Sequence, residues 1–284
     1  MANTTRIGNL KIINSRTWLA LAVVVMGCLS FIMIRQSSNT VVIGLTWDDK
    51  DLISPANFDH QPWSDLLQKY VDDDGLVNYK SWKNNQTDLQ KLTDYLESLS
   101  RVDANATISN DDDLAFWLNA YNALTVQAIL RIYPIESVRR HANPLGFNIW
   151  NHYKIMVDAR AYSLSDLMDG PLATSVDNRT RFGIVQGSVS CPKLARQAYF
   201  GCKVNAQLTD VVRRFFSDPR NIRVENEQRI HLSPVVRQVL NNLQGDTQQK
   251  LTQLSGIVPE HEAARLIQTA EICWFRHNWS LNQQ

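Results

Sequence analysis

One long helix constrains the fold of this chain more than any other segment. The stretch "NDDDLAFWLNAYNALTVQAILRIYP" predicts a helix over residues 110–134, because Asp111–Asp113 suit its N-terminal end and Pro134 marks its C-terminal end. Its apolar face is broad and consists of Leu114, Trp117, Leu118, Tyr121, Leu124, Thr125, Ala128, Ile129 and Ile132. A helix with so wide an apolar face needs partners on most sides. We therefore expect a domain that packs around it.

Shorter patterns of both kinds surround this helix. Helices are expected over residues 87–100, opened by a capping box of Thr87 and Gln90, and over residues 205–219, with Asn205 as the N-cap. Two or three further helices are expected near the C-terminus.

Strands are expected mainly between residues 147 and 185, where "NHYKIMVDARAYSL" and "RFGIV" flank a short helix in "SLSDLMD". A hairpin is expected over residues 221–233. Helices and strands mix without regular βαβ alternation, so the fold class predicted is α+β, with a mixed sheet packed against several helices.

A run of seventeen uncharged residues, Trp18–Ile34, predicts one transmembrane helix near the N-terminus. Three basic residues precede it and Arg35 closes it, so the positive-inside rule places the N-terminus in the cytoplasm and the remainder outside, most simply in a bacterial periplasm. Two alternatives remain open. Cleavage would release the domain, although no small-x-small site follows the run. Lipidation of Cys28 would anchor it, although "LSFIMI" stays apolar after that cysteine.

The chain is thus divided into a cytoplasmic tail and signal anchor (1–35), a spacer (36–60) and a globular domain (61–284). All 28 acidic residues and 25 of the 29 basic residues follow Arg35, which gives this part a net charge of 25 − 28 = −3. A mildly acidic body with no basic stripe is not expected to bind nucleic acid.

Cys191, in "VQGSVSCPKL", is a candidate nucleophile. A helix opened by Pro192 would place its thiol at the positive end of the helix dipole, where a thiolate is favoured. If residues 192–200 were one unbroken helix, Cys191 and Cys202 would lie roughly 16 Å apart, too far for a disulfide. The alternatives for Cys191 are a small buried hydrophobic residue, which the surrounding sequence favours, and a disulfide partner.

Five segments of the chain, taken in order, resemble the domain-of-unknown-function 547 (DUF547) family. They are "LLQKYVDDDGLVNYKSW", "AFWLNAYNALTVQAIL", "YSLSDL", "FGIVQGSVSCPKL…AY" and "NWSLN", and they span roughly residues 60–282. The resemblance implies a fold distantly related to papain-like and transglutaminase-like thiol enzymes. It also implies a thiol site, because bacterial relatives carry Glu and His after the "SL" pair, a Cys at the end of the later strand, and a second Cys before Pro.

This sequence departs from that pattern at three positions. Met168 and Asp169 stand where the family has Glu and His, and Gln186 stands where it has the first Cys. Gln cannot attack a carbonyl carbon, and a carboxylate with an ordinary pKa near 3.9 is a poor base for a thiol. Cys191 matches the second cysteine, which is Ser in some plant relatives. The departures therefore favour a domain that has lost thiol chemistry.

Cys191 could still act if a histidine served as its base. His152, on the segment "NHYKI", is the candidate chosen, and a later histidine is the alternative, although no histidine shares a motif with Cys191. No spacing of histidines, cysteines and carboxylates resembles a metal site, so neither a metal nor another cofactor is expected.

Two asparagines near the middle of an apolar helix also need an explanation. If Asn119 and Asn122 are buried, their amides must be hydrogen-bonded, most simply to loops such as 185–191, and with Tyr121 they either clamp those loops or line a pocket. The C-terminal Trp279, Ser280 and Asn282 are expected to lock the chain's end onto the domain. The candidate binding residues are Gln186, Asp169, Asn119, Tyr121, Asn122 and Ser190.

Two functions are consistent with these observations. The favoured one is a membrane-anchored, extracytoplasmic binding or accessory protein, a pseudoenzyme whose ligand is an envelope protein or peptide. The alternative is an active cysteine hydrolase or transferase of peptide or amide bonds that uses Cys191.

Overall fold

The computed structural model describes residues 40–105, 110–141, 148–175 and 177–284. The contacts within the chain group Val41–Gln284 into one compact unit. The predicted transmembrane run Trp18–Ile34 and the alternative lipidation site Cys28 lie outside the described residues. All the described helices and strands belong to the unit that begins at Val41.

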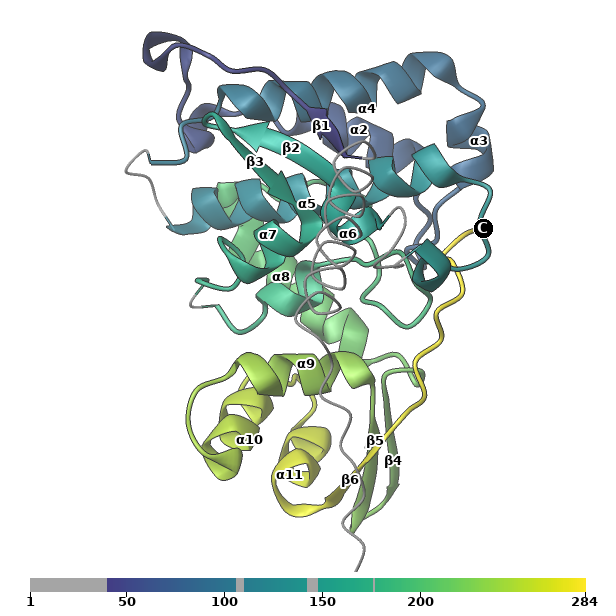
Figure 1. Ribbon diagram of the computed structural model, residues 1–284. Helices are drawn as coiled ribbons and strands as arrows, with labels where there is room; N and C mark the ends of the chain where they lie inside the picture. Colours follow the sequence, from purple (N-terminus) through teal and green to yellow (C-terminus); the bar gives the residue numbers. More distant parts are fainter. Residues whose placement is uncertain (1–39, 106–109, 142–147, 176) are drawn as a thin grey trace, which may run out of the picture. The chain divides into compact units, whose positions relative to one another are not determined.

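This unit has an α+β fold, as the sequence predicts. Its described residues form ten α-helices and two three-stranded sheets, rather than one sheet (Figure 1). The helices are α2 (Gln61–Tyr70), α3 (Tyr79–Lys83), α4 (Gln86–Ser98), α5 (Asn110–Ile132), α6 (Ile149–His152), α7 (Leu164–Asp169), α8 (Val204–Phe216), α9 (Pro234–Asn242), α10 (Thr247–Ser255) and α11 (His261–Thr269).

Helix α5 is the predicted core helix, and every residue from Leu114 to Val126 is buried. It contacts α4 on one side and α7 and α8 on others, which accounts for apolar residues around most of its circumference. It ends at Ile132, just before the Tyr133–Pro134 pair, because a residue that precedes proline disfavours the helical conformation.

The first sheet has the order β1-β2-β3 and packs in the larger hydrophobic core with α5. Strand β2 (Tyr153–Val157) pairs antiparallel with β3 (Arg160–Ser163) and parallel with β1 (Val41–Ile43). The prediction of a spacer over 36–60 is therefore wrong from Val41 onward. A three-residue strand shows no readable period, and here its pairing depends on a partner more than 100 residues away.

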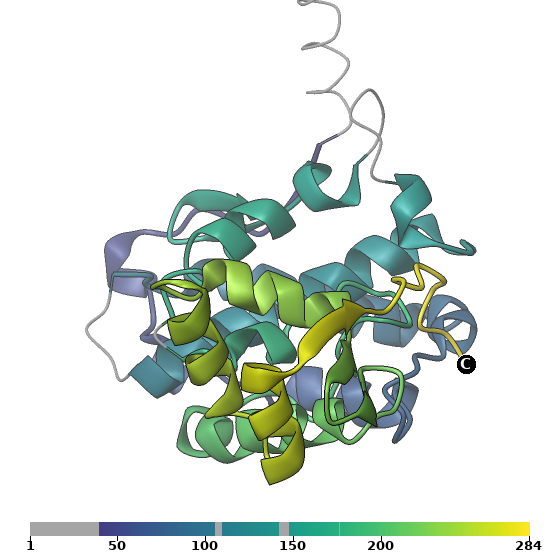
Figure 2. The same ribbon diagram turned by 90° about the horizontal axis from the view of Figure 1, so that it is seen from below.

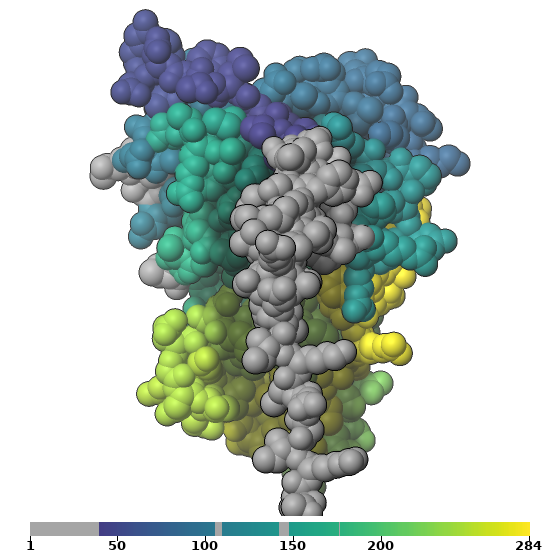
Figure 3. All heavy atoms as spheres, viewed as in Figure 1, coloured from purple at the N-terminus to yellow at the C-terminus, as the bar shows by residue number. Residues whose placement is uncertain are grey.

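The second sheet has the order β4-β5-β6 and packs with α9, α10 and α11 in a second hydrophobic core. Strands β4 (Ile222–Asn226) and β5 (Arg229–Leu232) form the predicted hairpin, and β6 (Glu271–Trp274) pairs parallel with β5. These C-terminal elements gather together at the lower end in Figures 1 and 3, and they lie nearest the viewer when the domain is seen from below (Figure 2).

Two predicted helix starts are wrong. Asn85, not Thr87, caps α4, and its Oδ1 accepts a hydrogen bond from the Asp88 backbone N–H at 3.1 Å. Helix α8 continues directly from a 3₁₀ turn over Gly201–Lys203, so Lys203 takes the N-cap position and Asn205 lies inside the first turn.

Two further predictions of regular elements are wrong, because the chain forms a turn or an irregular segment there. Thr180–Gly183 form a 3₁₀ turn where "RFGIV" predicted a strand, because the Val185 N–H bonds to a side chain of α5 instead of to a strand. No helix follows Pro192 either: the chain is irregular from Pro192 to Phe200.

Candidate functional site

The three positions that depart from the family pattern share one cavity of about 480 Å³. Met168 and Asp169 come from the last turn of α7, and Gln186 comes from the loop after the 3₁₀ turn at residues 180–183. The remaining lining residues come from several elements and are Arg139, Trp150, Leu164, Ser165, Gln238 and Trp279. Two of the predicted binding residues, Asp169 and Gln186, are therefore brought together.

Helix α7 is positioned by a complete capping box. The Ser163 hydroxyl accepts from the Asp166 backbone N–H at 3.1 Å, and the Asp166 carboxylate accepts from the Ser163 backbone N–H at 2.9 Å. With its first turn fixed in this way and Leu164 and Leu167 buried, the short helix presents Met168 and Asp169 to the cavity.

The loop that carries Gln186 is held by Asn122, as the sequence predicts. Asn122 Nδ2 donates to the Gly183 carbonyl at 2.9 Å, and its Oδ1 accepts from the Val185 N–H at 3.0 Å. Gly187 follows with φ +75°, and a Cβ there would collide with the Ile129 side chain. The polar clamp and the glycine together fix the position of Gln186.

Asn119 and Tyr121 behave differently from Asn122. Asn119 clamps Tyr199 rather than loop 185–191, donating to its carbonyl at 2.8 Å and accepting from its N–H at 2.9 Å. Tyr121 is fully buried, and its hydroxyl makes no hydrogen bond within the described residues. Burial raises the pKa of Tyr121, so it is a neutral phenol. Asn119 and Tyr121 do not line the cavity.

Cys191 is buried, and its thiol is not at a helix N-terminus. Its Sγ lies 2.9 Å from Ser188 Oγ and donates to Gln186 Oε1 at 3.8 Å. Burial raises the pKa of Cys191, and the hydrogen bonds from Ser188 offset this only in part. The group is therefore a thiol at neutral pH, and it lies behind Gln186 as seen from the cavity, which Cys191 does not line.

The histidine that hydrogen bonds connect to Cys191 is His277, not His152. Ser188 Oγ lies 2.9 Å from His277 Nε2, so a continuous path connects Cys191 to His277 through one hydroxyl. Burial first, and then the charge of Arg139, lower the pKa of His277, which keeps its imidazole neutral at pH 7. His152 lies at the end of α6, where its Nδ1 accepts from the Asn148 N–H at 3.0 Å.

Ser188 was not predicted from the sequence, and His277 was covered only by the alternative of a later histidine, because the two residues are 89 apart and share no motif. Ser190, a predicted binding residue, instead fastens the C-terminal segment: its Oγ accepts from the Asn278 N–H at 2.8 Å. Ser188 pairs with Leu281 in an isolated bridge, and Ser137 pairs with Ser280. The predicted locking of the C-terminus is confirmed.

Within the described ranges, no group of three or more histidines, cysteines and acidic residues is placed to hold a metal ion. Among the helices of those same ranges, none combines the length and the apolar character of a membrane span.

Residues 106–216 match the family described as "Protein of unknown function, DUF547". This stretch contains α5 to α8 and most of the cavity lining, including all three departure positions. Residues 106–216 are a DUF547 family domain. The match is narrower than the stretch of resemblance between residues 60 and 282. Neither the curated proteins nor the solved structures include a match to the chain.

The cavity is not made by the DUF547 domain alone. Gln238, from α9, and Trp279, from the C-terminal segment, lie beyond residue 216 and complete its wall. Trp279 also packs against His277, with ring centroids 4.0 Å apart, and under the guanidinium of Arg139. The C-terminal segment therefore contributes both to the cavity and to the polar path that ends at Cys191.

Proposed function

We propose that this chain is a binding protein built on a DUF547 domain, in which the cavity holds a peptide ligand and Cys191 does not react. The observation that carries the proposal is the position of Gln186. It occupies the cavity wall at the family's first cysteine position, while the remaining thiol is buried behind it and protonated. A protonated thiol without access to the cavity cannot attack a bound ligand.

The lining of the cavity supports a peptide as the ligand. Trp150, Trp279 and Met168 provide apolar contact, and Gln186 and Gln238 provide side-chain amides that can both donate to and accept from a peptide group. The guanidinium of Arg139, which lies over the Trp279 ring and makes no ion pair with the described residues, adds a charged donor to the lining. A volume of about 480 Å³ falls in the usual range for ligand sites.

The setting of this binding protein is part of the proposal. The uncharged run Trp18–Ile34, with basic residues before it and Arg35 after it, supports a signal anchor with the domain outside the cytoplasm. Ligands of an anchored periplasmic domain would be envelope proteins or peptides. The departures at Met168, Asp169 and Gln186 support a scaffold derived from a thiol enzyme that no longer catalyses.

The path from Cys191 through Ser188 to His277 favours one alternative, an active cysteine hydrolase or transferase. In that case the Cys191 proton would pass to Ser188 Oγ as the Ser188 proton passes to His277 Nε2, leaving a thiolate. Gln186 would then have to move aside to admit the substrate.

Site-resolved alkylation separates the two functions. The full chain is treated with iodoacetamide between about pH 6 and pH 9, on either side of an ordinary thiol pKa, and each cysteine is quantified by mass spectrometry. The exposed Cys202 is the internal control. We expect Cys202 to react as an ordinary thiol in the folded protein. Cys191 should react only after the protein is denatured. Rapid alkylation of Cys191 at about pH 6 would establish a thiolate and support the hydrolase.

Ligand binding itself is tested by selecting a random phage-displayed peptide library on the full chain. Met168→Trp, which fills the cavity, is compared with Met168→Leu, which keeps its volume. Peptides that bind the wild type and the Leu variant but lose affinity for the Trp variant would support the proposal. A selection in which no enriched peptide distinguishes the two variants would contradict it.

A further inference from the structure

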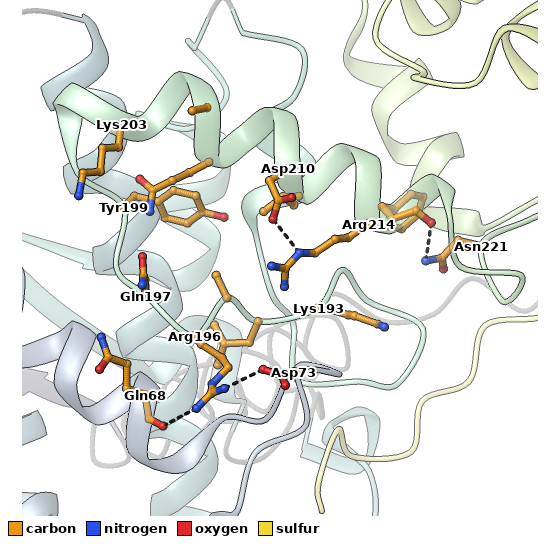
Figure 4. Close-up of a pocket in the computed structure, with 16 residues that line it drawn as sticks. Gln68, Asp73, Lys193, Arg196, Gln197, Tyr199, Lys203, Asp210, Arg214 and Asn221 are labelled. Carbon is orange, nitrogen blue, oxygen red and sulfur yellow. Dashed lines mark hydrogen bonds and ion pairs between the residues drawn. The ribbon is translucent and has the colours of Figure 1, made fainter.

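A second hollow in the molecule shares no lining residue with the cavity formed by Met168, Asp169 and Gln186. It is a groove of about 680 Å³ between α8 and the irregular segment that follows Cys191 (Figure 4). Lys203, Asp210 and Arg214 lie along the α8 side, and Lys193, Arg196 and Gln197 lie along the other. Tyr199 and Phe215, both buried, form apolar surface within it.

The segment that forms one wall of the groove has unused main-chain groups. From Lys193 to Gln197, no backbone N–H or C=O makes a hydrogen bond with the described part of the chain. Pairing resumes at Ala198, whose N–H donates to Ser64 Oγ and whose carbonyl accepts from Gln207. The Lys193–Leu194 backbone packs against Gly75 and Leu194 is buried, so the accessible free donors and acceptors are those of Ala195–Gln197. These groups run beside the groove and are suited to pair with an added extended chain.

The groove contains one basic side chain that no described carboxylate neutralises. Four basic side chains line it, Lys193, Arg196, Lys203 and Arg214, against two acidic ones, Asp73 and Asp210. Residues 36–284 as a whole carry a net charge of 25 − 28 = −3. Three of the four basic side chains are already paired, Lys193 with Asp74 and Asp218, Arg196 with Asp73, and Arg214 with Asp210. One positive charge, that of Lys203, is left over, and on an acidic body it selects for negative charge in whatever binds there.

Lys203 is the basic residue best placed to attract a ligand. Lys193 is paired with Asp74 at 3.0 Å, Arg196 with Asp73 at 2.7 Å and Arg214 with Asp210 at 2.7 Å. The exposed Lys203 ammonium, by contrast, makes no ion pair with any described residue. Its Nζ lies over the Phe200 ring, 5.9 Å from the ring centroid. An acidic side chain bound beside Lys203 would gain a new ion pair without breaking an existing one.

We propose that this groove is a docking site for an acidic, extended peptide segment of a partner protein. The accessible main chain of Ala195–Gln197 would pair with the backbone of the segment, and Lys203 would pair with one of its carboxylates. The two carboxylates in the wall and the net negative body disfavour a nucleic acid, whose phosphates would meet both. The site is separate from the cavity, so this proposal does not depend on a peptide ligand in that cavity.

The test uses the random phage-displayed peptide library on the full chain, with Lys203→Glu as the groove variant. Lys203 is exposed and occupies the N-cap position of α8, where a negative charge favours the helix, so this variant is expected to fold. Lys80→Glu, an exposed residue of α3, makes the same change in net charge away from the groove. Met168→Trp serves as the cavity control.

We expect acidic peptides to be enriched, and their affinity, measured by fluorescence anisotropy, to fall about tenfold or more in Lys203→Glu. Affinity should stay unchanged in Lys80→Glu and in Met168→Trp. N-methylation of alternate amides in a selected peptide should abolish binding, because it removes main-chain donors without altering the protein. The proposal is overturned if no acidic peptides are enriched, if Lys203→Glu and Lys80→Glu act alike, or if N-methylation has no effect.

Discussion

Replacing Asn122 by alanine is the sharpest test of how the cavity is built. The side chain is almost completely buried and makes two hydrogen bonds to the loop that carries Gln186, at 2.9 Å and 3.0 Å. In the alanine variant, the Gly183 carbonyl and the Val185 N–H lose these partners inside the core. The cost of leaving a buried polar group unsatisfied is about 1–3 kcal/mol.

Two such groups make the expected loss of unfolding free energy about 2–6 kcal/mol. With a urea dependence of about 3 kcal/mol/M for a domain of this size, the midpoint should fall by about 0.7–2 M. The assay is urea unfolding of the full chain in mild detergent, followed by tryptophan fluorescence. Gln127, half-buried and further along α5, offers a control: Gln127→Ala removes an amide that bonds to a side chain and not to this loop.

The same substitution has a second, local consequence. When the loop is released, Gln186 should no longer shield Cys191, so alkylation of Cys191 should accelerate in Asn122→Ala under conditions in which the protein stays folded. An unfolding midpoint within experimental error of the wild type would refute the reasoning. So would a large destabilisation matched by Gln127→Ala, because the effect would then come from α5 in general and not from the clamp.

Three further predictions test other parts of the domain. Gly187→Ala should cost about 1–3 kcal/mol in urea unfolding, because the residue has φ +75° and its methyl group would collide with Ile129; a neutral result would show that the loop can relax. The hydrogen bond from Lys69, above all, lowers the pKa of Asp88 to about 2. The ionised Asp88 carboxylate contributes its full stabilisation above about pH 4, and this contribution is lost as the pH falls towards 2. Asp88→Asn should therefore be less stable than the wild type at pH 7 and should lose less unfolding free energy on acidification. Identical pH profiles of the two proteins would contradict this. Asn282→Ala removes the acceptor of the buried Tyr79 hydroxyl and should cost about 1–3 kcal/mol of unfolding free energy in thermal unfolding. Gln283→Ala, at the exposed neighbouring residue, should cost little.

Local patterns predicted the elements whose causes are local. The apolar residues of 110–134 repeat at helical spacing and lie in a helix that ends where the proline requires it. The hairpin over 221–233 and the buried, hydrogen-bonded state of Asn122 were likewise readable, since an amide in an apolar helix must find a partner. Where neighbouring signals compete, as between Asn85 and Thr87 at the start of α4, the pattern placed the helix correctly and its cap wrongly.

The sequence by itself thus determined the α+β class, the core helix and two residues of the cavity, Asp169 and Gln186. Tertiary structure alone decided which groups meet: β1 with β2, Ser188 with both Cys191 and His277, and α8 with the free main chain of Lys193–Gln197. The physical reason is that helix and strand periods record what one segment buries, whereas a hydrogen bond between residues 89 apart depends on how segments pack. The burial that makes Cys191 a protonated thiol is likewise a property of the packed domain and not of the "SCP" triplet.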